Sequence, residues 1–124
     1  MYRIGIKKQF SAAHRLEGHP GRCSQLHGHT WSVEAVISSK DTGMDGMVVD
    51  FDQVGDALDK AVDLFDHVCL NDVEPFDRIP PTAENVARVV YAALAARAAS
   101  SGWAARLESV TVWESAEAWA SFSD

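Results

Sequence analysis

The sequence predicts an α+β fold, in which a four-stranded antiparallel sheet carries two helices on one of its faces. Apolar and polar residues alternate along residues 2–12 and 28–39, which is typical of half-buried strands. Two later segments repeat apolar residues at helical spacing, and alternation returns near the C-terminus. The resulting order is strand, strand, helix, helix, strand, strand. The 124 residues, 47% of them hydrophobic, are enough for one domain over residues 1–124.

The first two strands show the clearest alternation. On the first strand, the apolar face is interrupted only by Lys8 and consists of Tyr2, Ile4, Ile6, Phe10 and Ala12. On the second strand, one face consists of Trp31, Val33, Ala35 and Ile37. Gly18, Pro20 and Gly21 mark the connection as a loop. We expect the two strands to pair in antiparallel fashion.

Two helices are expected in the middle of the chain. Asp50 or Asp52 caps the first helix, whose apolar stripe is Val54, Leu58, Ala61, Val62 and Phe65. Thr82 is a good N-cap for the second helix, which should end near Gly102. The apolar stripe of the second helix is Val86, Val89, Val90, Ala93 and Leu94. Residues 66–72, between the helices, are expected to form an irregular link.

The last part of the chain predicts two more strands, over residues 107–114 and 116–122. Four strands leave two open edges, and helices on one side leave the other face of the sheet bare. Proteins usually pair, charge or cover such edges. Because closing several sheets into a shared barrel would cover edges and bare face together, we expect a homo-oligomer.

Charge is distributed unevenly along the chain. The net charge of −7 argues against a nucleic-acid partner. Residues 1–29 nevertheless hold five cations against one acid, a balance of +4, whereas residues 30–124 hold six cations and seventeen acids, a balance of −11. A basic segment in an acidic chain favours a small anionic substrate near it.

We expect neither a membrane segment nor a secretory signal. No apolar run approaches the roughly 20 residues that a membrane helix needs, and the N-terminus lacks a signal-peptide core. Two cysteines are too few for a disulfide framework, so we expect a cytoplasmic protein with free thiols. We expect Cys69 to be a small buried hydrophobic residue and His19 to be an ordinary loop residue.

The stretch from Cys23 to His29 concentrates the residues that carry chemistry. If residues 27–29 are extended, His27 and His29 leave the same face of a strand. His14 ends the preceding strand, and three imidazoles suit a catalytic Zn²⁺, which keeps one open position. Cys23, not needed as a ligand, is then a candidate acid or base. The alternative is that these histidines are ordinary surface residues.

Six motifs follow one another along nearly the whole chain. They are Phe10-Ser-Ala-Ala-His14, Cys23-x3-His27-Gly-His29, Gly46-Met-Val-Val-Asp50-Phe51, Leu64-Phe-Asp66-His67 with Leu70-Asn71, Pro81-Thr-Ala-Glu84-Asn85 and Val112-Trp-Glu114. Together they resemble the 6-pyruvoyltetrahydropterin synthase and 6-carboxytetrahydropterin synthase superfamily. The resemblance implies a tunnelling fold, in which subunits pair edge to edge into barrels. The implied assembly is commonly a hexamer of two trimers, with active sites at subunit interfaces.

The resemblance also implies roles for individual residues. The residues that match the family's zinc ligands are His14, His27 and His29. Those that match the proton-transfer groups are Cys23, Asp66 and His67. Those that match the pterin-binding stretch are Glu114, Thr82 and Glu84. In this comparison a neighbouring subunit contributes Asp66 and His67, and Glu114 anchors the pterin ring at the end of the substrate away from the metal.

The implied substrate is 7,8-dihydroneopterin triphosphate. Three residues separate Cys23 from His27, which resembles the branch that forms 6-carboxy-5,6,7,8-tetrahydropterin with release of acetaldehyde and triphosphate, toward queuosine and other 7-deazapurines. One alternative is a 6-pyruvoyltetrahydropterin synthase, which keeps the whole side chain. Another is a non-catalytic metal- or pterin-binding module. A zinc hydrolase is disfavoured, because the motif offers a thiol where such an enzyme needs a carboxylate base.

Overall fold

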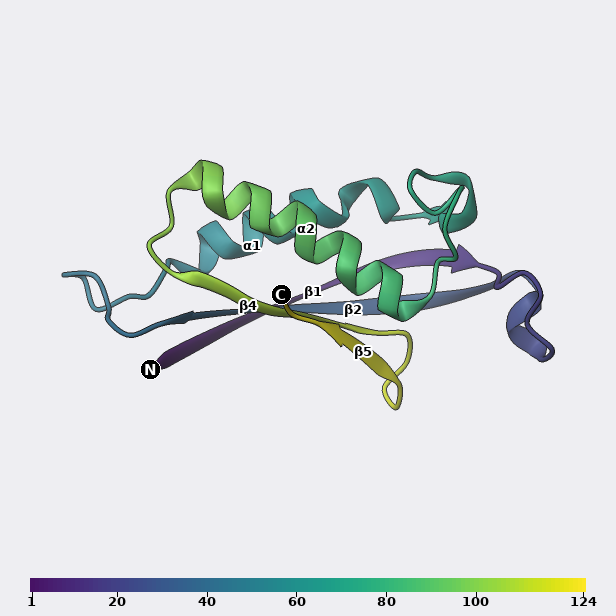
Figure 1. Ribbon diagram of the computed structural model, residues 1–124, viewed down its shortest axis with the longest axis horizontal. Helices are drawn as coiled ribbons and strands as arrows, with labels where there is room; N and C mark the ends of the chain where they lie inside the picture. Colours follow the sequence, from purple (N-terminus) through teal and green to yellow (C-terminus); the bar gives the residue numbers. More distant parts are fainter.

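The computed structural model describes residues 1–124 and arranges them in two layers, with two α-helices on one face of a five-stranded sheet (Figure 1). In chain order the elements are β1 (Tyr2–His14), β2 (His27–Ser39), α1 (Phe51–Val62), β3 (Val68–Cys69), α2 (Ala83–Ser101), β4 (Arg106–Trp113) and β5 (Trp119–Phe122). Short 3-10 turns are η1 (Arg22–Ser24), η2 (Asp63–Phe65) and η3 (Leu70–Asp72). The predicted α+β class is confirmed, with one added strand.

The added strand, β3, lies in the stretch that was expected to be an irregular link. Its residues Val68 and Cys69 pair in parallel with Ala12 and Ala13 of β1. Two residues are too few to show an alternating pattern, so the pairing leaves no mark in the sequence. The sheet order is β3-β1-β2-β4-β5, and the expectation of four strands, all antiparallel, is wrong. Cys69, expected to be buried, is only half-buried.

The ladder between β1 and β2 is the longest in the sheet and fixes the position of the histidines. It is antiparallel and runs from Tyr2 opposite Ser39 to His14 opposite His27, as predicted. The same register puts Ala12 opposite His29. Since alternate residues share a face, all three histidines lie on the helix-covered face, at one end of the ladder.

Both helices begin at the predicted caps and α2 ends at Gly102 as predicted, but α1 ends at Val62, so Phe65, expected on its apolar stripe, lies on the 3-10 turn η2. The side chain of Asp50 accepts a hydrogen bond from the N–H of Asp52 at 2.7 Å and caps α1. The hydroxyl of Thr82 accepts one from the N–H of Asn85 at 3.2 Å and caps α2. Gly102 ends α2 with φ 71°, a left-handed conformation that costs glycine little.

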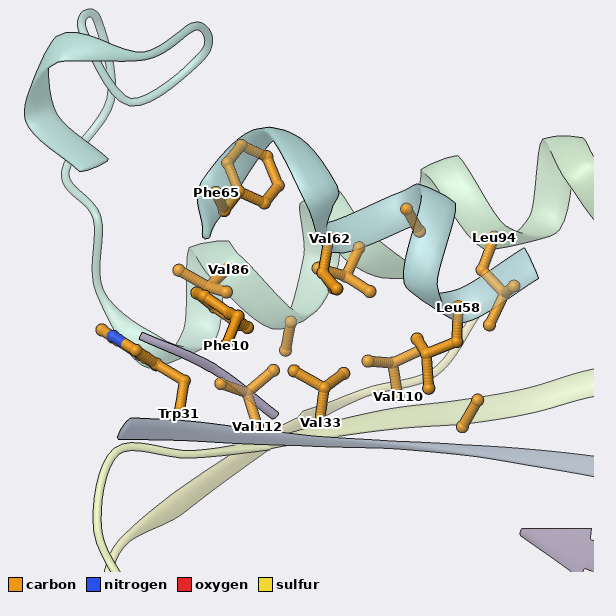
Figure 2. Close-up of a cluster of buried hydrophobic side chains, with 14 of the residues drawn as sticks. Phe10, Trp31, Val33, Leu58, Val62, Phe65, Val86, Leu94, Val110 and Val112 are labelled. Carbon is orange, nitrogen blue, oxygen red and sulfur yellow. The ribbon is translucent and has the colours of Figure 1, made fainter. Parts of the chain in front are cut away.

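The hydrophobic core fills the space between the sheet and the two helices (Figure 2). The side chains of Trp31, Val33, Val110 and Val112 rise from the sheet and are completely buried, and Leu58, Val86 and Leu94 meet them from the helices. Burying each such aliphatic side chain contributes roughly 1.5–3 kcal/mol. The core ends at Trp31, whose ring centroid lies 4.9 Å from that of His14. The histidines therefore continue the packed core, and they do not project from a loop.

The second face of the sheet and most of its edges have no partner within the chain. β3 covers only the last part of β1, so residues 2–10 form one open edge, and β5 forms the other. Trp119 on β5 is 62% exposed. Neither helix is both long enough and apolar enough to cross a membrane.

Candidate metal centre

Three imidazoles converge where β1 ends and β2 begins. Ring centroids lie 4.6 Å apart for His14 and His27, 5.1 Å for His14 and His29, and 4.8 Å for His27 and His29. One nitrogen from each ring lies within 4.8 Å of the other two. The predicted grouping of these residues is confirmed, and three convergent imidazoles suit a single metal ion.

Backbone carbonyls fix the orientation of two of the rings. His14 Nδ1–H donates to the carbonyl of Pro81 at 2.7 Å, and His27 Nδ1–H donates to the carbonyl of Gln25 at 2.7 Å. Because a carbonyl can only accept, the proton of each neutral ring is on Nδ1 and the lone pair is on Nε2. This is the arrangement in which a protein presents imidazole to a metal.

Two ring nitrogens of the group are buried without a partner in the chain. The Nε2 atoms of His14 and His29 are buried and have no hydrogen-bond partner. A buried polar atom left without a partner costs about 1–3 kcal/mol. A metal ion between the rings would satisfy both atoms, so these residues fit a metal better than they fit a purely structural role.

Burial also favours the protonation state that a metal requires. Desolvation lowers the pKa of His14 below its usual 6.5, although the Pro81 carbonyl and Glu114 oppose the shift. Desolvation lowers the pKa of His29 in the same way, again opposed by Glu114. Both rings are therefore held in the neutral form that can donate a lone pair.

Glu114 lies beside the three histidines. Its Oε1 is 3.8 Å from His14 Nε2, and its backbone N–H donates to the carbonyl of Ala118 in the turn between β4 and β5. Glu114 was expected at the end of the substrate away from the metal, and within this chain it lies beside the candidate metal ligands. The register of the sheet explains this position. Trp113 pairs with Ser32, and because the two strands are antiparallel, the next residue, Glu114, lies toward Trp31 and the histidine end of β2.

Cys23 lies on the turn η1, in the loop between β1 and β2. The thiol is half-buried, and the Cys23 carbonyl accepts a 2.7 Å hydrogen bond from the N–H of Leu16. Its sulfur does not belong to the group of converging ligand atoms, which consists of the three histidines.

Asp66 and His67 form a pair at the edge of β1. His67 Nδ1 lies 2.9 Å from Asp66 Oδ1, and the same carboxylate oxygen accepts a 2.9 Å bond from the N–H of Ser11. The hydrogen bond from the N–H of Ser11 is the main cause that holds the pKa of Asp66 below its usual 3.8, and the contact with His67 lowers this pKa further. The His67 side chain is 80% exposed, and no hydrogen bond or ion pair connects the pair to the histidine group.

Thr82 and Glu84 occupy the start of α2, next to the Pro81 carbonyl that orients His14. Thr82 lines a cleft of about 720 Å³ between residues 15–20 and residues 76–82. Glu84 is exposed and does not line this cleft. Within one chain the structure thus brings Thr82 near the histidines and leaves Glu84 facing outward.

Comparison with known proteins decides the family. The family model described as 6-pyruvoyl tetrahydropterin synthase matches residues 3–124. The chain belongs to the 6-pyruvoyl tetrahydropterin synthase family. It is therefore an enzyme of a pterin synthase family, as the motifs predicted.

Individual members agree with this assignment. A Rickettsia bellii protein named 6-carboxy-5,6,7,8-tetrahydropterin synthase is 38% identical over 104 residues, which cover 70% of this chain and 75% of the relative. A Synechocystis sp. protein of the same name is 37% identical over 99 residues, which cover 76% and 75%. The structure of Caenorhabditis elegans 6-pyruvoyl tetrahydropterin synthase superposes with a TM-score of 0.87 at 25% identity, covering 99% of this chain and 95% of that one. The tunnelling fold expected from the sequence is thereby confirmed.

Sequence reasoning missed the backbone groups of this pterin synthase site. The carbonyls of Pro81 and Gln25 orient two rings, but a carbonyl is common to every residue and leaves no signal in a sequence. A proline directly before the helix cap Thr82 marks a fixed turn, without saying which ring the turn will face.

Proposed function

We propose that this protein converts 7,8-dihydroneopterin triphosphate and one water to 6-carboxy-5,6,7,8-tetrahydropterin, releasing acetaldehyde and triphosphate, in a zinc-dependent reaction that leads toward queuosine or other 7-deazapurines. The main support is the buried pair of unpartnered Nε2 atoms on His14 and His29, which a metal would complete. The names of the two bacterial relatives, at 37% and 38% identity, favour the carboxy-forming reaction.

Zn²⁺ is the metal that this donor set suits best. Three neutral imidazoles with an open fourth position are typical of catalytic zinc, whereas Mg²⁺ and Ca²⁺ prefer oxygen ligands. When bound by His14, His27 and His29, zinc would act as a Lewis acid on the hydroxyl groups of the substrate side chain.

The remaining residues would move protons and hold the substrate. Cys23 is the proposed base, because it lies in the loop that leads into β2, only four positions before the candidate ligand His27, and a thiolate can accept a proton. His67, oriented by Asp66, is the proposed partner in proton transfer. Glu114 would accept hydrogen bonds from the substrate, from a place beside the metal ligands.

We also propose that the active sites are completed by assembly. Cys23 and His67 are not joined within the chain, and His67 points outward from a sheet edge. Open edges on β1 and β5 would allow sheets to pair into a barrel, with trimers stacked as a hexamer. In such an assembly the exposed Glu84 and the Asp66–His67 pair could face a substrate held by a neighbouring chain. Light scattering should report a mass several times 13.5 kDa.

A second candidate is the 6-pyruvoyl tetrahydropterin synthase reaction, which removes triphosphate without cleaving the side chain. The similarity in fold to the Caenorhabditis elegans enzyme favours it. A non-catalytic metal- or pterin-binding module would need neither Cys23 nor the Asp66–His67 pair. Incubation of the purified protein with 7,8-dihydroneopterin triphosphate, followed by identification of the product by mass spectrometry, distinguishes these three candidate functions. A product that carries a carboxyl group at position 6 supports the proposal, and an intact pyruvoyl side chain or no turnover contradicts it.

A further inference from the structure

His14 is a buried candidate ligand at the very end of a strand. Its side chain is only 1% exposed, yet it is the last residue of β1, directly before the loop that follows. The parallel ladder with β3 stops at Ala13. On the other side His14 still pairs with His27 of β2. A strand end tends to fray, whereas a metal ligand must keep one orientation, so contacts on the β3 side would also help to hold the chain here.

Asn71 supplies the first of these contacts. The N–H of Arg15 donates to Asn71 Oδ1 at 2.9 Å, and Asn71 Nδ2 donates to the carbonyl of Arg15 at 3.0 Å. A neighbouring strand would make the same two bonds, but the chain turns into η3 at Leu70, which is fully buried in the core. The Asn71 side chain thus continues the ladder past the end of β3. As a result, His14 lies between two fixed residues, Ala13 and Arg15.

Asn85 supplies the second contact, on the side of the imidazole ring. Its Nδ2 donates to the carbonyl of Pro80 at 2.9 Å, while its backbone N–H donates to the Thr82 hydroxyl. Residues 80–82 are therefore tied back to the first turn of α2. Between those two ties lies the Pro81 carbonyl, which accepts the Nδ1–H of His14.

We propose that Asn71 and Asn85 are positioning residues of the metal centre. Asn71 fixes the backbone that carries His14, and Asn85 fixes the carbonyl that orients its ring. The inference rests on the metal site of the proposed function and adds two residues that contact neither the ligand nitrogens nor each other. Outer hydrogen bonds of this kind are typically worth about 10- to 100-fold in metal affinity.

The two amides differ in a way that makes the inference testable. The Asn71 amide both accepts a bond from Arg15 and donates one to it, whereas the Asn85 amide donates to Pro80 and accepts only a 3.4 Å bond from the exposed Arg88. An aspartate at position 71 would keep the acceptor. An aspartate at position 85 would lose the donor and place a carboxylate oxygen against a carbonyl oxygen. Asn71→Asp should therefore keep part of the positioning of His14, and Asn85→Asp should lose the contact that positions the Pro81 carbonyl.

The experiment measures Zn²⁺ and Co²⁺ affinity of the purified full chain by competition with a chelator. Asn71→Ala and Asn85→Ala should each bind both ions about 10- to 100-fold more weakly, with a changed visible absorption spectrum of bound Co²⁺. Asn71→Asp should fall between wild type and Asn71→Ala, and Asn85→Asp should bind no better than Asn85→Ala. The control is Gln53→Ala, which removes an exposed amide from α1 and should match wild type.

Thermal unfolding of the metal-free proteins separates positioning from general stability. A lower Tm combined with wild-type affinity and an unchanged Co²⁺ spectrum would make both asparagines purely structural and overturn the inference. Wild-type binding by Asn85→Asp would also overturn it. If Asn71→Ala does not fold, Asn71→Asp tests the same contact. A wild-type protein that binds neither ion would overturn the proposed metal site itself, which distinguishes the two failures.

Discussion

Two groups of ionisable side chains are attached to β1 only three residues apart, and they are built differently. The group around His14 is enclosed by the core, and two of its rings are oriented by carbonyls at 2.7 Å. The Asp66–His67 pair is anchored to Ser11 at the sheet edge, with its side chains 44% and 80% exposed. The first group has buried nitrogens without partners, whereas in the second each member binds the other.

This difference shows how one chain could serve two active sites. The buried lone pairs of the histidine group can be satisfied only by a ligand that enters the space between the rings, and a metal ion is small enough to fit there. An exposed, already hydrogen-bonded pair is prepared for something that docks from outside. We therefore interpret the histidine group as the half-site a chain builds for its own substrate, and the Asp66–His67 pair as the half-site it offers to a neighbour.

The largest effect should come from removing a ligand of the enclosed group. His27→Ala leaves two imidazoles, so bound zinc should be lost almost completely, and turnover should fall below detection. Elemental analysis after gel filtration measures the zinc. His19→Ala, an exposed loop histidine, is the matched control and should keep about one zinc per chain. Full zinc occupancy in His27→Ala would exclude this residue as a ligand.

The next effect concerns a residue that acts on protons and does not hold the metal. Cys23→Ala should keep zinc and the fold while turnover falls about 10²- to 10⁴-fold, the usual contribution of one positioned acid or base. Cys23→Ser should be nearly as poor, because a hydroxyl is far less acidic than a thiol. Cys69→Ala is the control thiol. Loss of zinc in Cys23→Ala would show that Cys23 is a ligand, and near wild-type turnover would show that it has no catalytic role.

The smallest effect is a difference in acid sensitivity between the two groups. Burial lowers the pKa of His14 and His29 below 6.5, so in the metal-free protein the unfolded chain binds protons that the folded chain does not. The free energy of unfolding should therefore fall as the pH drops below about 6.5 and level off below the folded-state pKa values. Urea unfolding across this range tests it. His14→Gln should reduce the slope, and an unchanged slope would contradict the role of burial.

Asp66 should respond in a lower pH window. The Ser11 N–H lowers its pKa below 3.8, so its contribution to stability is present above that pH and is lost as the pH falls through the folded-state value. Asp66→Asn should leave the slope near pH 6 unchanged and alter only the acid limb. A change near pH 6 would contradict the separation of the two groups.

Much of the fold follows from local signals in the sequence. Alternation predicted the ladder of β1 and β2, and cap residues such as Thr82 and Gly102 predicted the limits of α2, because these signals depend on neighbours along the chain. The grouping of the three histidines could also be predicted. His27 and His29 share a strand face, and antiparallel pairing of the two strands places His14, at the end of β1, beside them.

The rest depends on contacts between distant residues. β3 exists because two residues happen to meet β1, and their own composition does not require a strand. The position of Glu114 depends on the register between β2 and β4, which a residue count cannot supply. The proposed roles of Asn71 and Asn85 lie in bonds to backbone groups up to 56 positions away, so only the folded chain points to them.

The division of the active site between chains is the central claim, and mixed oligomers test it most directly. Cys23→Ala and His67→Ala chains, each nearly inactive alone, would be unfolded together, reassembled at equal concentration with Zn²⁺, and assayed. If a site takes Cys23 from one chain and His67 from another, random mixing should leave about a quarter of the sites with both groups intact, and activity should return to roughly that fraction of wild type. If both groups came from the same chain, no mixed site would be intact. Activity equal to the average of the two variants would contradict the account.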